Sequence, residues 1–330
     1  MLRIALFGAG RAGTIHARNI ASHPQAKLSY VFDIDPSAAE RIVASYGGQQ
    51  ASDPDEIWQA GNVDAILIAS ATNTHVDLLR EAVRAHKPTY CEKPIDLDIT
   101  KVKQVVAEVG QTNLPIFIGF RRRFLADIQR MYKQIKTGAL GQLETIHIVA
   151  RDLAPPPIAY VNVSGGLLRD KMIHYFDLAP WLVNERPSEV YAMGSCLIDP
   201  TIGEAGDIDT ATVMLRFPSG VLCTIENGRR CAYGVEDRVE LFGARGMLQA
   251  MPPHAHHLRY FSDKGLEQGR YPDLFGEESF ASALDAFITA VQAGNPVSPS
   301  LQDGLQAQLI AEAAVQSLQI NQPVPISYDV

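Results

Sequence analysis

The first residues whose types and spacing could do chemistry are three glycines near the start of the chain. The hexapeptide GAGRAG follows the apolar run LRIALF and gives Gly8, Gly10 and Gly13 the spacing GxGxxG. In such a turn the first glycine allows a tight bend, the second lets the backbone approach a pyrophosphate, and the third allows close helix–sheet packing. The phosphates would lie on unpaired N–H groups at the start of the helix. The sequence therefore predicts a dinucleotide-binding turn that also contains Arg11 and Ala12.

A carboxylate at the end of the second apolar run indicates which dinucleotide binds. Asp33 stands twenty residues beyond Gly13. A carboxylate there can accept hydrogen bonds from the adenosine ribose hydroxyls, and it repels the 2′-phosphate of NADP. The next residues, Ile34 and Asp35, include no arginine that would offset this repulsion. We therefore expect NAD as the cofactor, and we expect Asp35 to cap the following helix.

Two later segments carry groups that could assist hydride transfer. CEKPIDLD (91–98) places Lys93 where a strand leaves the sheet, and SGGLLRDKMIHYFD (164–177) places Asp170 and His174 four residues apart. On a helix these two would share one face. Hydride transfer to a nicotinamide requires a group that removes the hydroxyl proton, and histidine or lysine is suited to this. From spacing alone, a solvated lysine and a surface Asp/His pair remain the alternative interpretation.

The elements that must position these residues follow from the hydrophobic pattern. From residue 2 to about 120, short apolar runs alternate with helical periods. The pattern predicts strands over 2–8, 27–33, 63–70, 88–94 and 115–120, and helices over 12–22, 36–47, 75–86 and 98–109. Such alternation is typical of a parallel sheet covered on both faces by helices, as in a Rossmann domain.

After residue 121 the β-rich segments gather together. Strands are expected over 144–150, 188–197, 209–217, 221–228 and 236–246, and helices over 123–137, 168–184, 278–293 and 301–317. Strands grouped in this way indicate a mostly antiparallel sheet. We therefore expect an α/β chain with two domains, an N-terminal domain over 1–121 and a C-terminal α+β domain over 122–330.

Composition limits the classes of function. The chain has 330 residues, 46% of them apolar, and a formal net charge of −8, which argues against nucleic-acid binding. It has no apolar run long enough for a membrane span, and its first residues do not resemble a secretory signal. Four scattered cysteines suggest reduced thiols rather than a metal site or disulfides. We expect a cytoplasmic protein.

Two clusters of basic or histidine residues have plainer interpretations. His254, His256 and His257 are spaced too closely for a tetrahedral site and have no interleaved carboxylate, so we expect a solvated loop and no metal. Arg121, Arg122 and Arg123 could bind an anion, but structural ion pairing is the favoured role for at least two of them.

The order of these motifs resembles the glucose-fructose oxidoreductase/inositol dehydrogenase family over essentially the whole chain. The matching features are GAGRAG, Asp33, ATNTH (71–75), CEKP and the GG…D…H…D pattern. The resemblance implies a Rossmann domain that binds NAD, followed by a domain with a large, open, mainly antiparallel sheet for substrate binding and oligomerisation. It implies a catalytic triad of Lys93, Asp170 and His174. It also implies cofactor contacts from Ala71, Asn73, His75 and Glu92.

Within the family, the segments 91–98, 119–124, 150–166 and 227–246 resemble those of inositol 2-dehydrogenases. This resemblance implies NAD-dependent oxidation of a ring hydroxyl of myo-inositol to the ketone. His174 would be the general base, Asp170 would orient it, and Lys93 would stabilise the developing alkoxide. The implied substrate contacts are Lys93, Arg123, Asp152, Asp170, His174, Asp177 and Tyr233.

Some residues depart from the inositol dehydrogenase pattern. Tyr175 stands where an acidic residue is common, Arg121 stands where asparagine is common, and DKMIH replaces the more usual DMTIH. Another inositol isomer or an aldose is therefore an alternative substrate. A second alternative is an NAD-binding regulator without catalysis, because a fold does not fix a function. Family members assemble through the open sheet, so the resemblance implies a homotetramer.

Overall fold

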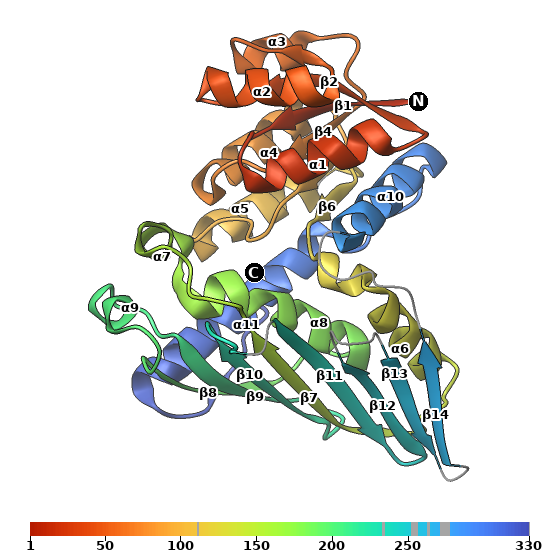
Figure 1. Cartoon of the computed structure of the whole chain (residues 1–330), viewed down its shortest axis with the longest axis vertical. Coiled ribbons are helices and arrows are strands. Elements are labelled where there is room, and N and C mark those ends of the chain that lie inside the picture. The colour runs from red at the N-terminus through yellow and green to blue at the C-terminus, as the bar shows by residue number, and fades with distance from the viewer. Residues whose placement is uncertain (111, 233–234, 252–256, 263–264, 271–277, 330) are drawn as a thin grey trace. The chain divides into compact units, whose positions relative to one another are not determined.

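The computed structural model describes residues 1–110, 112–232, 235–251, 257–262, 265–270 and 278–329. The chain forms two compact units, whose elements are labelled in Figure 1. Unit 1 comprises residues 1–121 and 276–305, and unit 2 comprises residues 122–275 and 306–330. The sequence prediction placed the boundary at the same residue but assigned 276–305 to the second domain. The helix Glu278–Ala293 (α10) instead packs against α1 (Arg11–Ser22) of unit 1.

Unit 1 contains a six-stranded parallel sheet with the strand order β3-β2-β1-β4-β5-β6. Its strands are β1 (Leu2–Phe7), β2 (Ala26–Phe32), β3 (Gln49–Gln50), β4 (Ala65–Ile68), β5 (Thr89–Cys91) and β6 (Ile116–Ile118). Its further helices are α2 (Pro36–Tyr46), α3 (Pro54–Gln59), α4 (His75–Arg84) and α5 (Ile99–Gly110), with one 3₁₀ turn at Thr72–Thr74. This order confirms the predicted Rossmann-type arrangement.

The sequence explains why this sheet is buried on both faces. All four residues of β4 and the last four of β1 are buried, as expected for apolar runs without alternation. Helix α10 adds an aromatic contact to the core, because Phe287 meets the ring of Tyr90 edge-on at 5.9 Å and Tyr90 stacks on Phe117. This contact helps to hold 276–305 in unit 1.

Unit 2 contains a nine-stranded sheet with the order β14-β13-β12-β11-β7-β10-β9-β8-β15. All its neighbouring strands are antiparallel except β7 and β10, which confirms the mainly antiparallel sheet. The strands are β7 (Leu143–Arg151), β8 (Glu189–Ser195), β9 (Thr210–Arg216), β10 (Leu222–Gly228), β11 (Glu236–Gly243), β12 (Gly246–Met251), β13 (His257–Ser262), β14 (Gly265–Arg270) and β15 (Val324–Pro325). The helices are α6 (Ala126–Lys136), α7 (Ile158–Ser164), α8 (Ile173–Val183), α9 (Pro200–Glu204) and α11 (Leu301–Ile320), whose residues from 306 onward belong to this unit.

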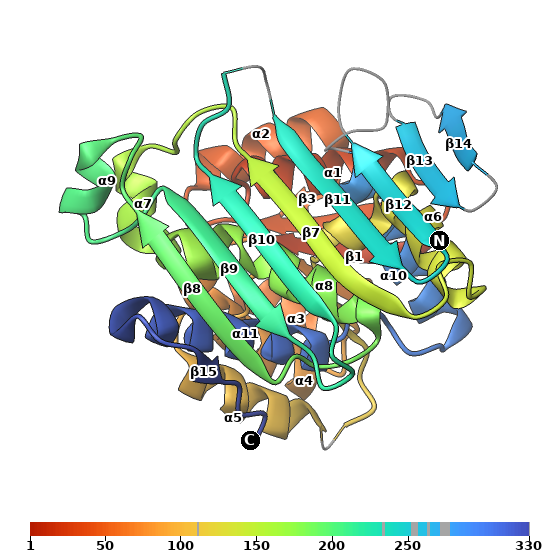
Figure 2. The same cartoon turned by 90° about the horizontal axis from the view of Figure 1, so that it is seen from below.

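Helices cover one face of this sheet. Helix α8 packs on β7, α6 packs on β12, and Ser317 of α11 accepts a hydrogen bond from the backbone of β8. Figure 2 shows the strands side by side with α8 and α11 behind them. On the other side, which we call the open face, alternate side chains are exposed, as with Thr212, Met214 and Arg216 of β9. The alternation predicted from the sequence is therefore that of a sheet with one covered face.

Two sequence expectations differ from the structure in detail. The prediction of a loop at the histidine cluster is wrong for His257, which begins β13. His254 and His256 lie outside the described residues. The helix expected over 123–137 begins only at Ala126, after a 3₁₀ turn at Arg121–Phe124. No helix in the described part of the chain is both long and apolar enough to cross a membrane.

Candidate active site

The glycine turn of unit 1 has the geometry that dinucleotide binding requires. Gly8 has a φ of 98°, and a Cβ placed there would lie 2.4 Å from the backbone nitrogen of Ser70. A Cβ on Gly13 would lie 2.0 Å from the carbonyl oxygen of Gly8. At Gly10, by contrast, no described atom lies within 4 Å of such a Cβ, so the backbone is open to approach. No described side chain caps α1, and its first N–H groups remain available to an anion.

Asp33 holds this turn from the end of the neighbouring strand. Its Oδ2 accepts a hydrogen bond from the Ala9 N–H at 2.6 Å, and its Oδ1 accepts one from the Asp35 N–H at 2.8 Å. Asp35 in turn accepts from the Ser37 N–H, which confirms that Asp35 caps α2. The carboxylate of Asp33 therefore serves the glycine turn rather than the helix.

A pocket of about 590 Å³ lies beside the glycine turn within unit 1. Of the ten predicted cofactor contacts, it is lined by Gly8, Gly10, Asp33, Ala71 and Asn73. Ile34, which is 94% exposed, adds an apolar wall next to Asp33. Arg11, Ala12 and Gly13 form the first turn of α1. The pocket thus combines an apolar wall, a carboxylate and open backbone, which suits an adenosine and its phosphates.

The remaining two predicted cofactor contacts are buried side chains with partners inside unit 1. The His75 ring is 1% exposed, with Nδ1 2.9 Å from the Pro94 carbonyl oxygen and Nε2 3.1 Å from that of Ser70. Glu92 is 8% exposed, and its Oε1 lies 2.7 Å from Nε2 of His16. Direct contact of either residue with the cofactor stays a prediction. Lys93, between Glu92 and Pro94, follows β5 as the sequence indicated.

In unit 2, Asp170 and His174 do not lie on one regular α-helix as expected over 168–184. A π-helical turn spans Leu167–Lys171, and α8 begins at Ile173. The carboxylate of Asp207 fixes the start of the turn by accepting from the Leu167 N–H at 3.0 Å, in space that a side chain on Gly166 would fill. Asp170 is in the π turn and His174 in the first turn of α8, so simple α-helical spacing does not describe the pair.

Both side chains are largely buried. Asp170 is 8% exposed and His174 is 7% exposed. The Tyr160 hydroxyl, on α7, donates a hydrogen bond to Asp170 Oδ1 at 3.0 Å. This contact could not be predicted from the sequence, because no known motif pairs a tyrosine with an aspartate ten residues later.

The other predicted substrate contacts of unit 2 are held in ion pairs. Arg123 donates two hydrogen bonds to Asp177, one from Nε to Oδ2 at 2.7 Å, and both side chains are buried. Lys171 donates to Asp152 at the end of β7. The only sequence feature that pointed to Lys171 was the pentapeptide DKMIH, which stands where DMTIH is more usual. Tyr233, the last predicted contact, lies outside the described residues.

The three consecutive arginines have separate structural partners. Arg121 donates to the Ser279 hydroxyl at 2.8 Å and lies over the Phe280 ring, both within unit 1. Arg122 pairs with Asp237 in unit 2 and lies over the Tyr175 ring. With the Arg123–Asp177 pair, these contacts confirm the structural interpretation of the arginine run.

Tyr175, which departs from the inositol dehydrogenase pattern, is also explained by its contacts. It is fully buried, and its hydroxyl donates to Asp237 Oδ1 at 3.1 Å. It therefore completes the charged pair of Arg122 and Asp237 in the interior of unit 2.

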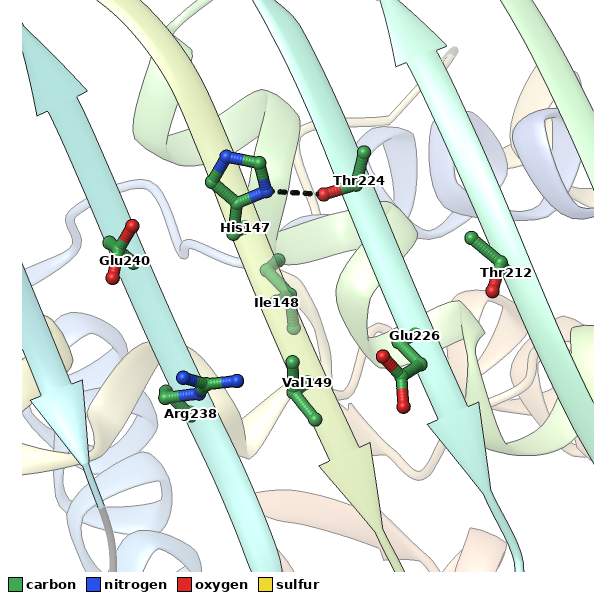
Figure 3. A pocket seen from close by; sticks show the side chains of 8 residues that line it. All are labelled: His147, Ile148, Val149, Thr212, Thr224, Glu226, Arg238 and Glu240. Carbon is green, nitrogen blue, oxygen red and sulfur yellow. Dashed lines mark hydrogen bonds between the residues drawn. The ribbon is translucent and has the colours of Figure 1, made fainter.

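A second cavity, of about 430 Å³, lies on the open face of the unit 2 sheet (Figure 3). Its polar lining comes from four strands and consists of His147, Thr212, Thr224, Glu226, Arg238 and Glu240. His147 Nδ1 lies 2.6 Å from the Thr224 hydroxyl oxygen. Because α8, which carries His174, packs on the other face, this cavity and His174 lie on opposite sides of the sheet.

Two family models match the chain. Residues 2–120 match the oxidoreductase family with an NAD-binding Rossmann fold, and residues 128–249 match the GFO/IDH/MocA C-terminal domain. The chain belongs to the GFO/IDH/MocA oxidoreductase family. The resemblance seen in the sequence is thereby confirmed, as are the oxidoreductase class and NAD as the cofactor.

Known proteins match this family member over its full length. Myo-inositol 2-dehydrogenase from Thermotoga maritima is 37% identical over 329 residues, which are 98% of each chain. The crystal structure of a myo-inositol dehydrogenase from Corynebacterium glutamicum has a TM-score of 0.90 at 35% identity and covers 100% of both chains. A scyllo-inositol dehydrogenase from Lactobacillus casei, solved with bound NAD(H) and scyllo-inositol, has a TM-score of 0.87 at 27% identity, with 99% of each chain covered.

Proposed function

We propose that this protein is an NAD-dependent inositol 2-dehydrogenase that oxidises a ring hydroxyl of myo-inositol to the ketone. The observation that carries this proposal is the similarity to a myo-inositol 2-dehydrogenase, which is 37% identical over 329 residues. The chain also contains the predicted catalytic residues Lys93, Asp170 and His174. The polar side chains of unit 2 give it a chemical basis. A polyol needs many hydrogen-bond partners, and the segments around Asp152 and Asp170 supply carboxylates, an ammonium and a phenol.

The cofactor fits the residues of unit 1. The turn at Gly10 is open to a pyrophosphate, α1 presents its uncapped N–H groups, and Asp33 lies at the pocket wall where ribose hydroxyls would bind. Bound NAD supplies the acceptor for the hydride that leaves the substrate carbon. We propose that Arg11, Ala12, Gly13, Ala71, Asn73, His75 and Glu92 complete this site.

The chain itself must supply the proton chemistry. His174 accepts the hydroxyl proton as the carbonyl forms, and Asp170 favours the imidazolium by its negative charge. Lys93 donates to the substrate oxygen and stabilises its developing negative charge. Arg123, Asp152, Asp177 and Tyr233 bind the other hydroxyls, with Arg123 and Asp177 acting as one bonded pair.

In the proposed mechanism Asp170 must stay negatively charged, and a neutral hydrogen-bond donor can stabilise that charge. Because the Tyr160 hydroxyl donates to one carboxylate oxygen, Asp170 is the acceptor in this hydrogen bond. The Tyr160 hydroxyl therefore supports the ionised form of Asp170 in the proposed mechanism.

A substrate panel tests the proposal. Purified protein would be incubated with myo-, scyllo- and chiro-inositol, glucose or galactose, with NAD and NADP in parallel, and reduced nicotinamide would be followed by absorbance. We expect the highest kcat/KM with myo-inositol and NAD, and loss of most turnover in His174→Ala. A preference for scyllo-inositol or an aldose would show that the substrate is not myo-inositol. If no polyol led to reduced nicotinamide, a regulator without catalysis would be favoured.

We also propose that the chain assembles as a homotetramer in the cytoplasm. The open face exposes large apolar side chains, with Met193 at 56%, Met214 at 44% and Phe242 at 44% exposure, and a second copy would cover them. The four cysteines are free thiols, which suits a reducing compartment.

Light scattering of purified protein tests the assembly. We expect a tetramer for the wild type and a smaller species for Met214→Glu. Leu197→Glu changes an apolar residue of unit 2 that is even more exposed, at 72%, but is not on a strand, and it should leave the mass unchanged. A wild-type monomer would contradict the proposal.

A further inference from the structure

Lys93 stands between two residues that are each held by a buried histidine of unit 1. On one side, His16 Nε2 lies 2.7 Å from Glu92 Oε1, and on the other, His75 Nδ1 lies 2.9 Å from the Pro94 carbonyl oxygen. His16 is 0% exposed and His75 is 1% exposed. Histidines this deep act on Lys93 through the groups that they hold.

The hydrogen bond of His16 has a defined direction. Among the described residues, His16 Nδ1 has no hydrogen-bond partner, so a proton on that nitrogen would be a buried, unsatisfied donor. The proton therefore belongs on Nε2, which donates to Glu92. Burial alone raises the pKa of Glu92, but the His16 hydrogen bond and the positive charges of Lys93 and Arg121 bring it below its usual value. Glu92 is thus a buried carboxylate beside Lys93.

The surroundings leave His16 and Glu92 little freedom. The His16 ring meets Tyr90 and Phe280 edge-on, with centroids 5.0 Å and 5.4 Å away. A Cβ on Gly119 would lie 2.9 Å from Glu92 Oε2, so the glycine leaves room for the carboxylate in this position. The pair is therefore a fixed link between α1 and the end of β5.

His75 forms a second link, from the residue after Lys93 to the cofactor pocket. Its Nε2 lies 3.1 Å from the carbonyl oxygen of Ser70, and Ser70 lines that pocket. Burial lowers the pKa of His75, so at neutral pH the ring carries one N–H and can donate to one of its two carbonyl oxygens. The His75 ring therefore packs between the pocket wall and Pro94, and its one N–H donates to one of the two carbonyl oxygens.

We propose that His16 and His75 are positioning residues that hold Lys93 at a fixed place relative to the cofactor pocket. His16 ties the Lys93 segment to the helix that would bind the pyrophosphate, and His75 ties it to the pocket wall. The inference rests on the proposed role of Lys93 in catalysis. Misplacement of a reacting group by about 1 Å costs on the order of 100-fold in rate, which gives such links a measurable effect.

The first test compares His16→Leu with His16→Gln. Glutamine keeps an N–H donor toward Glu92, whereas leucine removes it. We expect His16→Leu to lower kcat for myo-inositol by roughly 10- to 100-fold with little change in KM for NAD, and His16→Gln to recover most of the loss. His23→Leu is the matched control, because His23 follows the same helix and also pairs with a carboxylate, Asp285, at 3.1 Å. It should keep the wild-type kcat.

A second readout does not depend on turnover. An amine-reactive reagent would label Lys93, and peptide mass spectrometry would give its rate in the wild type, His16→Leu, His75→Leu and His23→Leu. We expect a severalfold change in the first two variants and none in the control. If His16→Leu does not fold, Glu92→Gln replaces it and should change the Lys93 rate in the same way.

The outcomes separate the two proposals. If the wild type oxidises no polyol, the proposed function fails, and the labelling rates still test the positioning of Lys93. Wild-type labelling rates in both leucine variants would overturn the inference, and so would a His16→Gln enzyme as slow as His16→Leu.

Discussion

The two units hold their polar site residues in different ways. In unit 1, Asp33 accepts from backbone N–H groups and His75 faces backbone carbonyl oxygens. In unit 2, the predicted substrate contacts are held by side chains that are distant in the sequence, such as Arg123 with Asp177 and Lys171 with Asp152. The first arrangement fixes the cofactor side through the fold of the backbone. The second makes the substrate side depend on complete ion pairs.

This difference has an energetic consequence. A side chain held by backbone groups can be replaced without leaving an opposite charge behind, whereas removal of one ion-pair partner leaves the other buried and unpaired. We therefore expect single substitutions in unit 2 to cost more stability than equivalent ones around the glycine turn.

The largest effect is expected at the buried pair of Arg123 and Asp177. Arg123→Met removes the guanidinium that pairs with a carboxylate whose side-chain exposure is 0%, and should lower the free energy of unfolding by about 3–5 kcal/mol. Arg123→Met combined with Asp177→Leu removes both charges and should be less destabilised than the single variant. Urea unfolding measures both variants, and a double variant at least as destabilised as Arg123→Met would contradict the role of the buried charge.

A smaller effect is expected at Asp209, a unit 2 carboxylate that is held by several backbone N–H groups. It accepts from the N–H groups of Leu197, Ile198 and Asp199, and these hydrogen bonds outweigh the effect of burial and lower its pKa from 3.8 to about 2. At about 1.4 kcal/mol per pKa unit, the shift corresponds to roughly 2 kcal/mol.

The sign of this contribution determines its pH dependence. Because the folded pKa lies below the unfolded one, the stabilisation is present above pH 3.8 and is lost as the pH falls through about 2. Asp209→Asn should therefore be less stable than the wild type at neutral pH, with a difference that shrinks in acid. Urea unfolding at several pH values checks this, and a difference independent of pH would show that the charge is unimportant.

The smallest effect is expected at Asp33, a unit 1 carboxylate that accepts from backbone N–H groups. Asp33→Ser removes the charge that repels a 2′-phosphate and should raise the ratio of kcat/KM for NADP over NAD about tenfold, or ~1.4 kcal/mol. Asp35→Ala is the control, since it removes the cap of α2 and should cost about 1 kcal/mol of stability without changing the ratio. An unchanged ratio in Asp33→Ser would assign selectivity to another residue.

The same difference explains how much the sequence could predict. Unit 1 follows from local rules, because apolar runs, Pro36 and the spacing of the glycines each fix their own neighbourhood. The open sheet followed from alternation in segments such as β9. In both cases the relevant interaction is made within a strand, a turn or a helix end.

What the sequence could not show depends on contacts between distant segments. His16 and Glu92 are 76 residues apart, and no spacing rule connects them. The π turn at Asp170 depends on Asp207, which accepts from Leu167 across 40 residues. The assignment of α10 to unit 1 likewise rests on aromatic contacts such as Phe287 with Tyr90. Such pairs become visible only when the fold brings them together.

In the proposed reaction, hydride passes from a ring carbon of myo-inositol to NAD, and His174 takes the proton. Myo-inositol carrying deuterium on carbon 2 tests it most directly, with mass spectrometry of the reduced nicotinamide and a comparison of rates for labelled and unlabelled substrate. We expect deuterium in the NADH formed by the wild type and almost no NADH from His174→Ala. NADH without the label, or wild-type turnover in His174→Ala, would contradict the account.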